Sequence, residues 1–580
     1  MMNREDFVLF IIKVSGVFLL LFLADSYSLI DRTNQLIYLY GSPGAIAFVL
    51  VWIACISSLL CITFLPNILV KLVFTCLIFV TTLLGATYAN ISGLPLLYDN
   101  LYVLLENTSF AGSALSHYSK EITLGSLIAL LSLTILLPPP SWVKKAWSSS
   151  KPVLPKYRVS HVHTTAYFII LAPFAAIFLA GLLRGGYGVQ ETPVQYRLSS
   201  LFSIIALENI VYRDSEPKTV DIDLHEPKTP ANIVLIVDES LRGDFIDING
   251  DNLGVTPYLF ANRNRVINFG YASSGANCSA DSNQIIRFGA NLNNFQTTFR
   301  SNPYLWQYAK KAGYKTVMIE GQAKPGSLNN RMTAEEISYI DEFVYAEGTG
   351  SRERDLHIAE LIKKTVTSGS DKPAFILAIK NGLHFPYDEK VPEEERKYKS
   401  SSAGYDIGNK ADLVNAYKNA ILYLTDPFFE SLLENEKYSD TVVFYTSDHG
   451  QNLLDNGSKQ THCSTDNASP YEALVPLLVI TDSDHFKKTF ESAALNNFDK
   501  ASHFNIAPTI LNLFGYEKEG VETRHGLSLL DDINEPRRFI SSVLRRKKLG
   551  LGNRNTVNWN YLPETLVSNS TQTENSLSRL

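Results

Sequence analysis

Long apolar stretches are concentrated before about residue 190 of this chain. A helix needs about 20 apolar residues to cross the hydrocarbon core of a bilayer. Five stretches of roughly that length follow one another, at Phe7–Ala24, Ala45–Phe64, Leu72–Ala89, Thr123–Leu137 and Ala166–Leu183. Any single stretch is also compatible with a buried core helix, but five in succession predict a transmembrane domain over residues 1–190.

The first stretch is longer than the roughly 7–15 apolar residues of a cleaved signal peptide, so we expect it to be retained. Lys13 lies inside it and must either snorkel to the membrane surface or face the helix bundle.

Basic residues between the stretches predict the orientation. The connection Pro138–Thr165 has no acidic residue and contains Lys144, Lys145, Lys151, Lys156 and Arg158. Residues 25–44 and 90–122 are nearly free of basic residues. Since Lys and Arg near membrane ends stay on the cytoplasmic side, we expect a cytoplasmic N-terminus and an exported chain after Leu183. In a bacterium the exported part would then lie in the periplasm or at the cell surface.

Residues 191–230 are expected to join the two parts. Apolar residues recur at helical spacing over Gln195–Tyr212, which fits an interfacial helix on the membrane or a helix that packs in a core. Arg213–Ala231 mixes charges with prolines and is typical of a linker. At the other end, residues 550–580 form a polar tail that we expect to be loosely packed.

Short β-rich runs alternate with helical patterns over residues 231–549. The predicted strands are Asn232–Val237, Lys315–Ile319, Ala374–Ile379, Thr441–Thr446 and Pro476–Ile480. The predicted helices are Pro303–Ala312, Arg354–Val366, Leu413–Leu433 and Phe504–Phe514. This alternation predicts an α/β domain with a mainly parallel sheet between helices. Catalytic groups of such sheets collect where the strands end.

Composition excludes several classes of protein. The chain of 580 residues has 46% hydrophobic residues, too many for a disordered protein, and 52 basic against 58 acidic residues, unlike a nucleic-acid binder. Five cysteines are too few for a disulfide-rich scaffold. Cys278 and Cys463 lie in the exported part, where an oxidising compartment permits a disulfide between them.

Acidic and histidine residues follow the predicted strands. Asp238-Glu239 ends the first strand and Asp448-His449 ends the fourth, while His384 follows the third and His462 lies in a later polar loop. Carboxylates with imidazole suit Zn²⁺, or a harder divalent ion such as Mn²⁺. The sequence therefore predicts a metal site at this edge of the sheet.

A nucleophile is expected in Ser273–Asn283. Its small and capping residues precede the helix-compatible run Gln284–Phe288, so Ser279 or Cys278 is a candidate for a helix N-terminus. Backbone N–H groups there stabilise an anionic oxygen or a phosphate, and a divalent cation helps a hydroxyl to lose its proton and attack phosphorus.

These motifs resemble those of the alkaline phosphatase and sulfatase superfamily. The carrying segments are Asp238–Arg242, Ser447–Gly450, Asn381–Tyr387 around His384, Tyr417–Leu433 and Ala507–Leu511. With five preceding spans, the chain resembles most the bacterial phosphoethanolamine transferases that modify lipid A, and more distantly the lipoteichoic acid synthases. The stretch Leu104–Thr108 is similar to a family segment at the membrane surface.

The resemblance implies a role for each matching residue. Glu239, Asp448 and His449 would bind zinc together with the oxygen of the nucleophile. His384 and His462 would contact the phosphoryl group or exchange protons. Glu106, Asn107 and Thr108 would contribute to the substrate site.

The register of Ser279-Ala280-Asp281-Ser282 matches the family nucleophile with Ser in place of Thr, whereas Cys278 would fit a different register. Neither residue is followed by the x-Pro-x-Arg of sulfatases, which argues against sulfate-ester hydrolysis. The chain also lacks the several periplasmic cysteine pairs of the lipid A enzymes.

The function implied is metal-dependent transfer of phosphoethanolamine from phosphatidylethanolamine to lipopolysaccharide, on lipid A or a core sugar, or to another surface glycan. The transfer would pass through a covalent phospho-enzyme. One alternative is a phosphoglycerol transferase that uses phosphatidylglycerol. Another is a non-catalytic, sulfatase-like scaffold that binds lipopolysaccharide.

Overall fold

The structure is a computed structural model of the whole chain. It describes residues 4–25, 29–93, 95–106, 118–138, 160–184, 186, 189, 191–211, 219–225, 231–250, 253–368, 371–400, 409–465, 467–541, 544 and 557–563. Two compact units are formed, one within Met1–Arg213 and one within Asp214–Arg546, and the second also holds residues 557–563.

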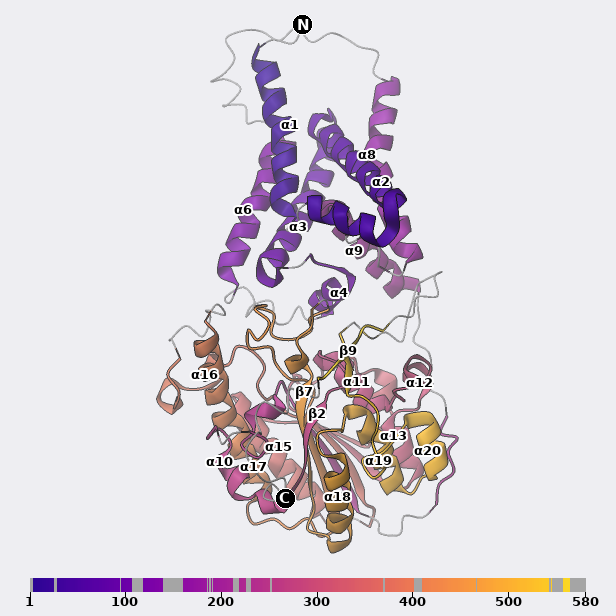
Figure 1. Cartoon of the computed structure of the whole chain (residues 1–580), viewed down its shortest axis with the longest axis vertical. Coiled ribbons are helices and arrows are strands. Elements are labelled where there is room, and N and C mark those ends of the chain that lie inside the picture. The colour runs from indigo at the N-terminus through magenta and orange to yellow at the C-terminus, as the bar shows by residue number, and fades with distance from the viewer. Residues whose placement is uncertain are drawn as a thin grey trace. The chain divides into compact units, whose positions relative to one another are not determined.

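The first unit is helical (Figure 1). Its helices are α1 (Arg4–Ala24), α2 (Leu29–Phe64), α3 (Ile68–Ser92), α4 (Tyr98–Glu106), α6 (Ser119–Leu136), α8 (Ser160–Leu183) and α9 (Val194–Val211). Five segments are long and apolar enough to cross a membrane: Phe7–Ala24, Ala45–Phe64, Ile68–Ser92, Ser119–Leu136 and Thr164–Leu183. The prediction of five apolar helices is confirmed. The basic residues of the connection after α6 lie outside the described residues.

Lys13 faces the helix bundle. Its side chain is 7% exposed, and Nζ donates to the carbonyl oxygens of Ile135 and Leu137 at 2.7 and 2.8 Å. The last carbonyls of a helix have no partner within the helix. The lysine therefore supplies donors to the end of α6, and its ammonium is hydrogen-bonded inside an apolar unit.

Helix α9 packs against α3 and α8. Leu198, Leu201 and Ile204 on its apolar stripe are buried. These contacts fit the alternative of a helix that packs in a core.

The second unit is built on a seven-stranded sheet of order β2-β7-β6-β1-β5-β3-β4. Its strands are β1 (Asn232–Asp238), β2 (Val266–Ser273), β3 (Lys315–Glu320), β4 (Glu342–Tyr345), β5 (Ala374–Ile379), β6 (Thr441–Ser447) and β7 (Leu474–Ile480). The five strands from β6 to β4 are parallel, and β7 runs antiparallel to both β6 and β2. The predicted mainly parallel sheet is confirmed, with β2 and β4 added.

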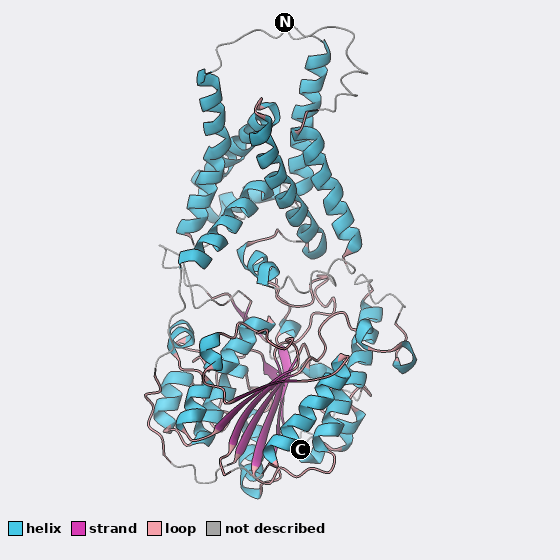
Figure 2. Cartoon of the chain, turned by 180° about the vertical axis from the view of Figure 1, so that it is seen from behind, coloured by secondary structure: helices cyan, strands magenta, loops and turns pink. Residues whose placement is uncertain are grey.

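Helices cover both faces of this sheet (Figure 2). The α-helices of this unit are α10 (Pro257–Ala261), α11 (Ser279–Phe288), α12 (Phe295–Ser301), α13 (Leu305–Lys311), α14 (Ala334–Ile337), α15 (Ser351–Val366), α16 (Lys410–Ala420), α17 (Asp426–Leu433), α18 (Asp484–Asn497), α19 (Ile506–Phe514) and α20 (Lys518–His525). A π-helical turn at Ile421–Thr425 joins α16 to α17, so the predicted helix Leu413–Leu433 is one interrupted helix.

The core follows from strand alternation. Ile233, Leu235 and Val237 point to one face of β1 and pack in a cluster with side chains of α11, α13, α18 and α19. Val234 and Ile236, on the opposite face, are also fully buried. Because both faces of the central strands are covered, these strands appear in the sequence as continuous apolar runs.

Residues 219–225 of the predicted linker and residues 557–563 of the predicted loose tail pack on this unit. Leu224 forms a bridge with Tyr516, and Ile222 is buried. In the tail, β9 (Trp559–Tyr561) pairs with β8 (Arg538–Ile540), and the Trp559 ring contacts the rings of Phe295 and Phe504. Apolar side chains within otherwise polar sequence account for this packing.

Candidate metal and nucleophile site

The predicted metal ligands and histidines meet at the carboxyl edge of the sheet. β1 and β6 are parallel neighbours with Asp238 opposite Ser447, so Glu239 and Asp448 follow at the same level. His384 follows β5, the other neighbour of β1. Gly382 lets this loop approach closely, because a Cβ at its position (φ +52°) would lie 2.8 Å from the backbone nitrogen of Glu239.

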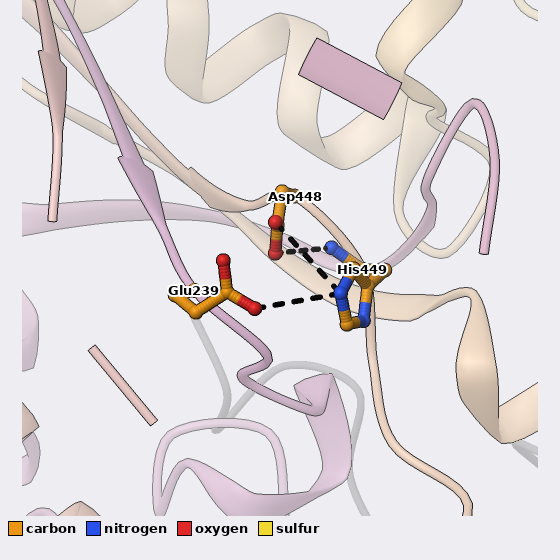
Figure 3. Close-up of side chains that lie close together, drawn as sticks. All are labelled: Glu239, Asp448 and His449. Carbon is orange, nitrogen blue, oxygen red and sulfur yellow. Dashed lines mark hydrogen bonds and ion pairs between the residues drawn. The ribbon is translucent and has the colours of Figure 1, made fainter. Parts of the chain in front are cut away.

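Glu239, Asp448 and His449 form a buried cluster with ligand atoms within 4.8 Å of one another (Figure 3). His449 Nε2 lies 3.5 Å from Glu239 Oε1 and 3.8 Å from Asp448 Oδ2. All three side chains are at most 2% exposed. Two carboxylates and one imidazole at this spacing suit a divalent cation.

The protonation of the cluster also fits a cation. Asp448 Oδ2 is buried and accepts no hydrogen bond from the described residues. Burial and the neighbouring Glu239 raise the pKa of Asp448 to about 8. Burial lowers the pKa of His449, but Asp448 and Glu239 outweigh this effect and raise it to about 9. Two carboxylates and an imidazole this close together in a buried place favour an added positive charge, and the residues present fit a divalent cation.

Backbone groups fix the ligands. His449 Nδ1 donates to the carbonyl oxygen of Gly450 at 2.7 Å, which directs Nε2 toward the carboxylates. Asp448 Oδ1 accepts the backbone N–H groups of Ser240 and His449 at 3.0 and 2.7 Å. Ser240 adopts a left-handed conformation (φ 63°), and its hydroxyl donates to Glu239 Oε1 at 2.6 Å. Hydrogen bonds of this kind orient metal ligands.

Ser279 lies beside this cluster. It is the first residue of α11, after Cys278 at the N-cap, so the helix begins five residues before the run Gln284–Phe288. Ser279 Oγ is 3.0 Å from His449 Nε2 and 3.4 Å from Glu239 Oε1. A hydroxyl at a helix N-terminus and next to a cation site is suited to attack a phosphoryl group.

The alternative nucleophile, Cys278, forms a disulfide with Cys463. A disulfide sulfur is no longer a nucleophilic thiolate, so the structure favours Ser279. The two loops are also held by Asn277, whose carbonyl oxygen accepts from Cys463 N and whose side chain donates to Ser464 O and Glu472 Oε2, each at 2.8 Å.

His384 and His462 lie near the cluster. The His462 ring stacks on His449 with centroids 4.5 Å apart, and the His384 ring centroid is 6.2 Å from that of His462. Burial lowers the pKa of both histidines, and the neighbouring His449 lowers it further. Both rings are therefore neutral near pH 7. His384 Nδ1 donates to the carbonyl oxygen of Phe385 at 2.7 Å, which places the lone pair of the neutral ring on Nε2.

Some residues of this edge were not predicted. Asp238, part of the predicted acidic pair, is bound by the buried Lys380, with Nζ 2.6 Å from Oδ2. Gln322, in the loop after β3, donates from Nε2 to Glu239 Oε2 at 2.9 Å. A lone Lys380 or Gln322 does not indicate a site in the sequence. Their contacts with Asp238 and Glu239 depend on the order of the strands in the sheet.

Three predicted substrate residues come from the sequence before the α/β unit. Glu106 is the last residue of α4. Asn107 and Thr108 lie outside the described residues.

Comparison with known proteins finds a family model that covers this site. The family model described as Sulfatase matches residues 231–516. The Kdo(2)-lipid A phosphoethanolamine 7''-transferase of Escherichia coli K12 is 24% identical over 294 residues, which are 49% of this chain and 51% of that protein. The phosphoethanolamine transferase EptC of Escherichia coli O18:K1:H7 is 23% identical over 507 residues, 81% of this chain and 83% of that protein.

The chain thus spans about half the length of the first of these relatives. Among solved structures, the integral membrane protein lipooligosaccharide phosphoethanolamine transferase A of Neisseria meningitidis superposes with a TM-score of 0.61 and 19% identity. The match covers 88% of this chain and 97% of that one. The two chains therefore share the fold of both units.

Proposed function

Because the Sulfatase family model matches residues 231–516, we propose that this protein is a metal-dependent phosphoethanolamine transferase of the bacterial inner membrane, in the alkaline phosphatase superfamily. One observation carries the proposal: Ser279 Oγ, at the start of α11, lies 3.0–3.4 Å from a buried cluster of metal-ligating side chains. The similarity to named phosphoethanolamine transferases supports the choice of head group.

Glu239, Asp448 and His449, with Ser279 Oγ, would hold Zn²⁺, or alternatively Mn²⁺ or another divalent ion. Such an ion supplies positive charge that favours loss of the hydroxyl proton and offsets charge developing on phosphoryl oxygens.

The donor is phosphatidylethanolamine, and the reaction has two steps. In the first, Ser279 Oγ bonds to the phosphorus, and the bond from phosphorus to the diacylglycerol oxygen breaks. The serine proton ends on that oxygen, so diacylglycerol leaves and phosphoethanolamine stays on Ser279. In the second step an acceptor hydroxyl or phosphate oxygen bonds to the phosphorus and the bond to Oγ breaks. Ser279 Oγ then takes the proton of the acceptor hydroxyl, or a proton from water where the acceptor oxygen has none.

His384 and His462 contact the phosphoryl group or carry these protons. A neutral imidazole can accept a proton in one step and donate it in the next. Their lowered pKa values favour the neutral, proton-accepting form. The acceptor is lipopolysaccharide, on lipid A or a core sugar, or another surface glycan.

A membrane location suits both lipid substrates. Five apolar helices anchor the chain, and the basic loop after α6 supports a cytoplasmic N-terminus and a periplasmic catalytic domain. We assign Glu106, Asn107 and Thr108 to the substrate site on the strength of the family resemblance.

The test uses full-length protein in detergent with phosphatidylethanolamine as donor. Intact-mass analysis should find a phosphoethanolamine adduct on the wild type and on Ser301→Ala, a matched change on α12, but none on Ser279→Ala. Cys278→Ala should still form the adduct. An adduct that survives in Ser279→Ala and is lost in Cys278→Ala contradicts the nucleophile, and transfer that persists with a strong chelator and in Asp448→Ala contradicts the metal mechanism.

Two further outcomes identify the alternatives. A phosphoglycerol adduct formed from phosphatidylglycerol in place of phosphatidylethanolamine would indicate a phosphoglycerol transferase. A wild-type protein that binds lipopolysaccharide but neither binds a metal nor forms any adduct would indicate a scaffold.

A further inference from the structure

The carboxylate of Glu239 is held on both of its oxygens. Oε1 accepts from the Ser240 hydroxyl at 2.6 Å and is the oxygen 3.5 Å from His449 Nε2. Oε2 accepts from Gln322 Nε2 at 2.9 Å. The second N–H of the same amide reaches the carbonyl oxygen of Lys380 at 3.0 Å. Gln322 therefore bridges the end of β5 and the ligand that follows β1.

The orientation of this amide follows from its partners. The Glu239 carboxylate and the Lys380 carbonyl only accept hydrogen bonds, so the nitrogen must face them. Gln322 Oε1, on the other side, accepts from Asn329 Nδ2 at 2.9 Å. All three heavy-atom contacts agree with one rotamer of the amide, which holds the nitrogen on Glu239.

The turn that carries Gln322 is itself fixed. The backbone N–H groups of Gln322 and Ala323 both donate to Glu320 Oε1, at 2.6 and 3.0 Å. Glu320 ends β3 and is buried. The backbone of Gln322 is thus fixed to the end of β3, and this fixes the point from which its side chain reaches Glu239.

The same network continues to the helix of the nucleophile. Asn329 is followed by Asn330 and Arg331, both in left-handed conformations with φ 51° and 54°. The Arg331 guanidinium pairs with Asp281, in the first turn of α11. One segment therefore contacts both the residue that holds Glu239 and the helix that begins with Ser279.

We propose that Gln322 is a positioning residue of the metal centre, whose amide fixes the rotation of the Glu239 carboxylate. The inference rests on the proposed metal site and deepens it. A neutral donor suits this position: it orients the carboxylate without cancelling the negative charge that attracts a cation. Hydrogen-bond partners of metal ligands typically contribute 10–100-fold to metal affinity.

The test measures metal affinity of the full-length protein in detergent, because this readout does not depend on transfer. Metal-free wild type, Gln322→Met, Gln322→Glu and Glu239→Gln are titrated with Zn²⁺ against a chelating dye. Methionine keeps the length of the side chain and removes the donor, so we expect Gln322→Met to bind about 10–100-fold more weakly. Gln322→Glu puts accepting oxygens in place of the donating N–H groups, so the visible Co²⁺ spectrum of this variant should also differ from that of the wild type.

The matched control is Gln296→Leu on α12, for which we expect wild-type affinity. With Co²⁺ in place of Zn²⁺, the visible absorption spectrum should change in Gln322→Met and not in the control, because the spectrum reports the geometry around the ion. Melting of the metal-free proteins checks that each variant is folded, and the Gln322→Glu data decide the question if Gln322→Met does not fold.

The outcomes separate the two claims. If the wild type binds no divalent ion, the proposed metal centre is wrong, and this inference falls with it. If the wild type and the control bind while Gln322→Met and Gln322→Glu bind equally tightly with an unchanged Co²⁺ spectrum, Gln322 has no positioning role and the metal centre stands.

Discussion

The disulfide between Cys278 and Cys463 should stabilise the α/β unit and hold its reacting groups together. Cys278 directly precedes Ser279, and Cys463 directly follows His462. The perturbation is the double variant Cys278→Ala and Cys463→Ala, which removes the cross-link and leaves two small apolar side chains. We expect a lower melting temperature and slower transfer.

The magnitude follows from the length of chain that the bond closes. The two cysteines are 185 residues apart in the sequence. Loop-closure entropy for such a loop corresponds to about 5 kcal/mol at 25 °C, and removal of native disulfides typically costs about 2–5 kcal/mol. The hydrogen bonds of Asn277 to the same loops remain, each with a net contribution of about 1 kcal/mol. We therefore expect a loss of about 2–5 kcal/mol, or about 4–10 °C in melting temperature at roughly 2 °C per kcal/mol.

The assay is thermal unfolding of the full-length protein in detergent, with and without a thiol-free phosphine reductant. Reductant should lower the melting temperature of the wild type to that of the double variant and leave the double variant unchanged. The matched control is Cys76→Ala, because Cys76 is a free, exposed cysteine of α3; it should respond to reductant as the wild type does.

Transfer is measured on the same samples below the melting transition. A double variant that melts within about 1 °C of the wild type refutes the stabilising role. Unchanged transfer rates in a folded double variant refute the positioning role, since Ser279 and His462 would then keep their places without the bond.

Three further predictions test other parts of the structure. In the folded, metal-free protein the pKa values of Asp448 and His449 are raised to about 8 and 9. The folded protein therefore binds protons that the unfolded chain releases at lower pH, so its melting temperature should fall as the pH rises from about 6 to about 9. Zn²⁺ binding should release protons from these groups, which calorimetry in buffers of different ionisation enthalpy detects. Glu472→Leu should destabilise the α/β unit by about 2–5 kcal/mol in thermal unfolding, because a buried carboxylate that accepts from Asn277 and two backbone N–H groups is lost. Lys13→Met should lower the melting temperature of the full-length protein by the equivalent of about 1–3 kcal/mol, because two carbonyl oxygens at the end of α6 lose their donor.

Each of these predictions has a contrary outcome. Stability of the metal-free protein that rises with pH over this range would mean that the cluster is not protonated as described. Glu519→Leu is the control for Glu472, because Glu519 is exposed on α20; equal effects of the two changes would contradict the role of the buried carboxylate. Wild-type stability of Lys13→Met would show that the helix end is satisfied without the lysine.

Local patterns were enough to predict most elements. The apolar spans are set by length and composition, and the central strands by continuous apolar runs. β2 was missed because Asn268 and Gly270 interrupt its run, where the pairing with β7 shifts register. β4 was missed because it is a four-residue edge strand with half-exposed side chains. In both cases the local sequence does not favour a strand, and hydrogen bonds from neighbouring strands stabilise it.

The cluster of Glu239, Asp448 and His449 was predictable from the positions where strands end. Glu239, Asp448 and His449 come directly after apolar runs, and the parallel arrangement brings such positions to one edge. Ser279 could be placed only near a helix N-terminus, with Cys278 as a competitor. The contact between Cys278 and Cys463 resolved this choice, and it joins loops far apart in the sequence.

The sequence alone determined the five apolar helices, the α/β pattern and the residue types of the metal cluster, because hydrophobic periodicity and strand ends are local properties of a chain. The tertiary structure decided which polar groups pair. Gln322 contacts Glu239 because the strand order β1-β5-β3 brings the loop after β3 to the same edge of the sheet. Asp238 pairs with Lys380, which follows β5, and is not one of the three clustered side chains. Such contacts depend on strand order and on burial, and no local pattern of residues records either of them.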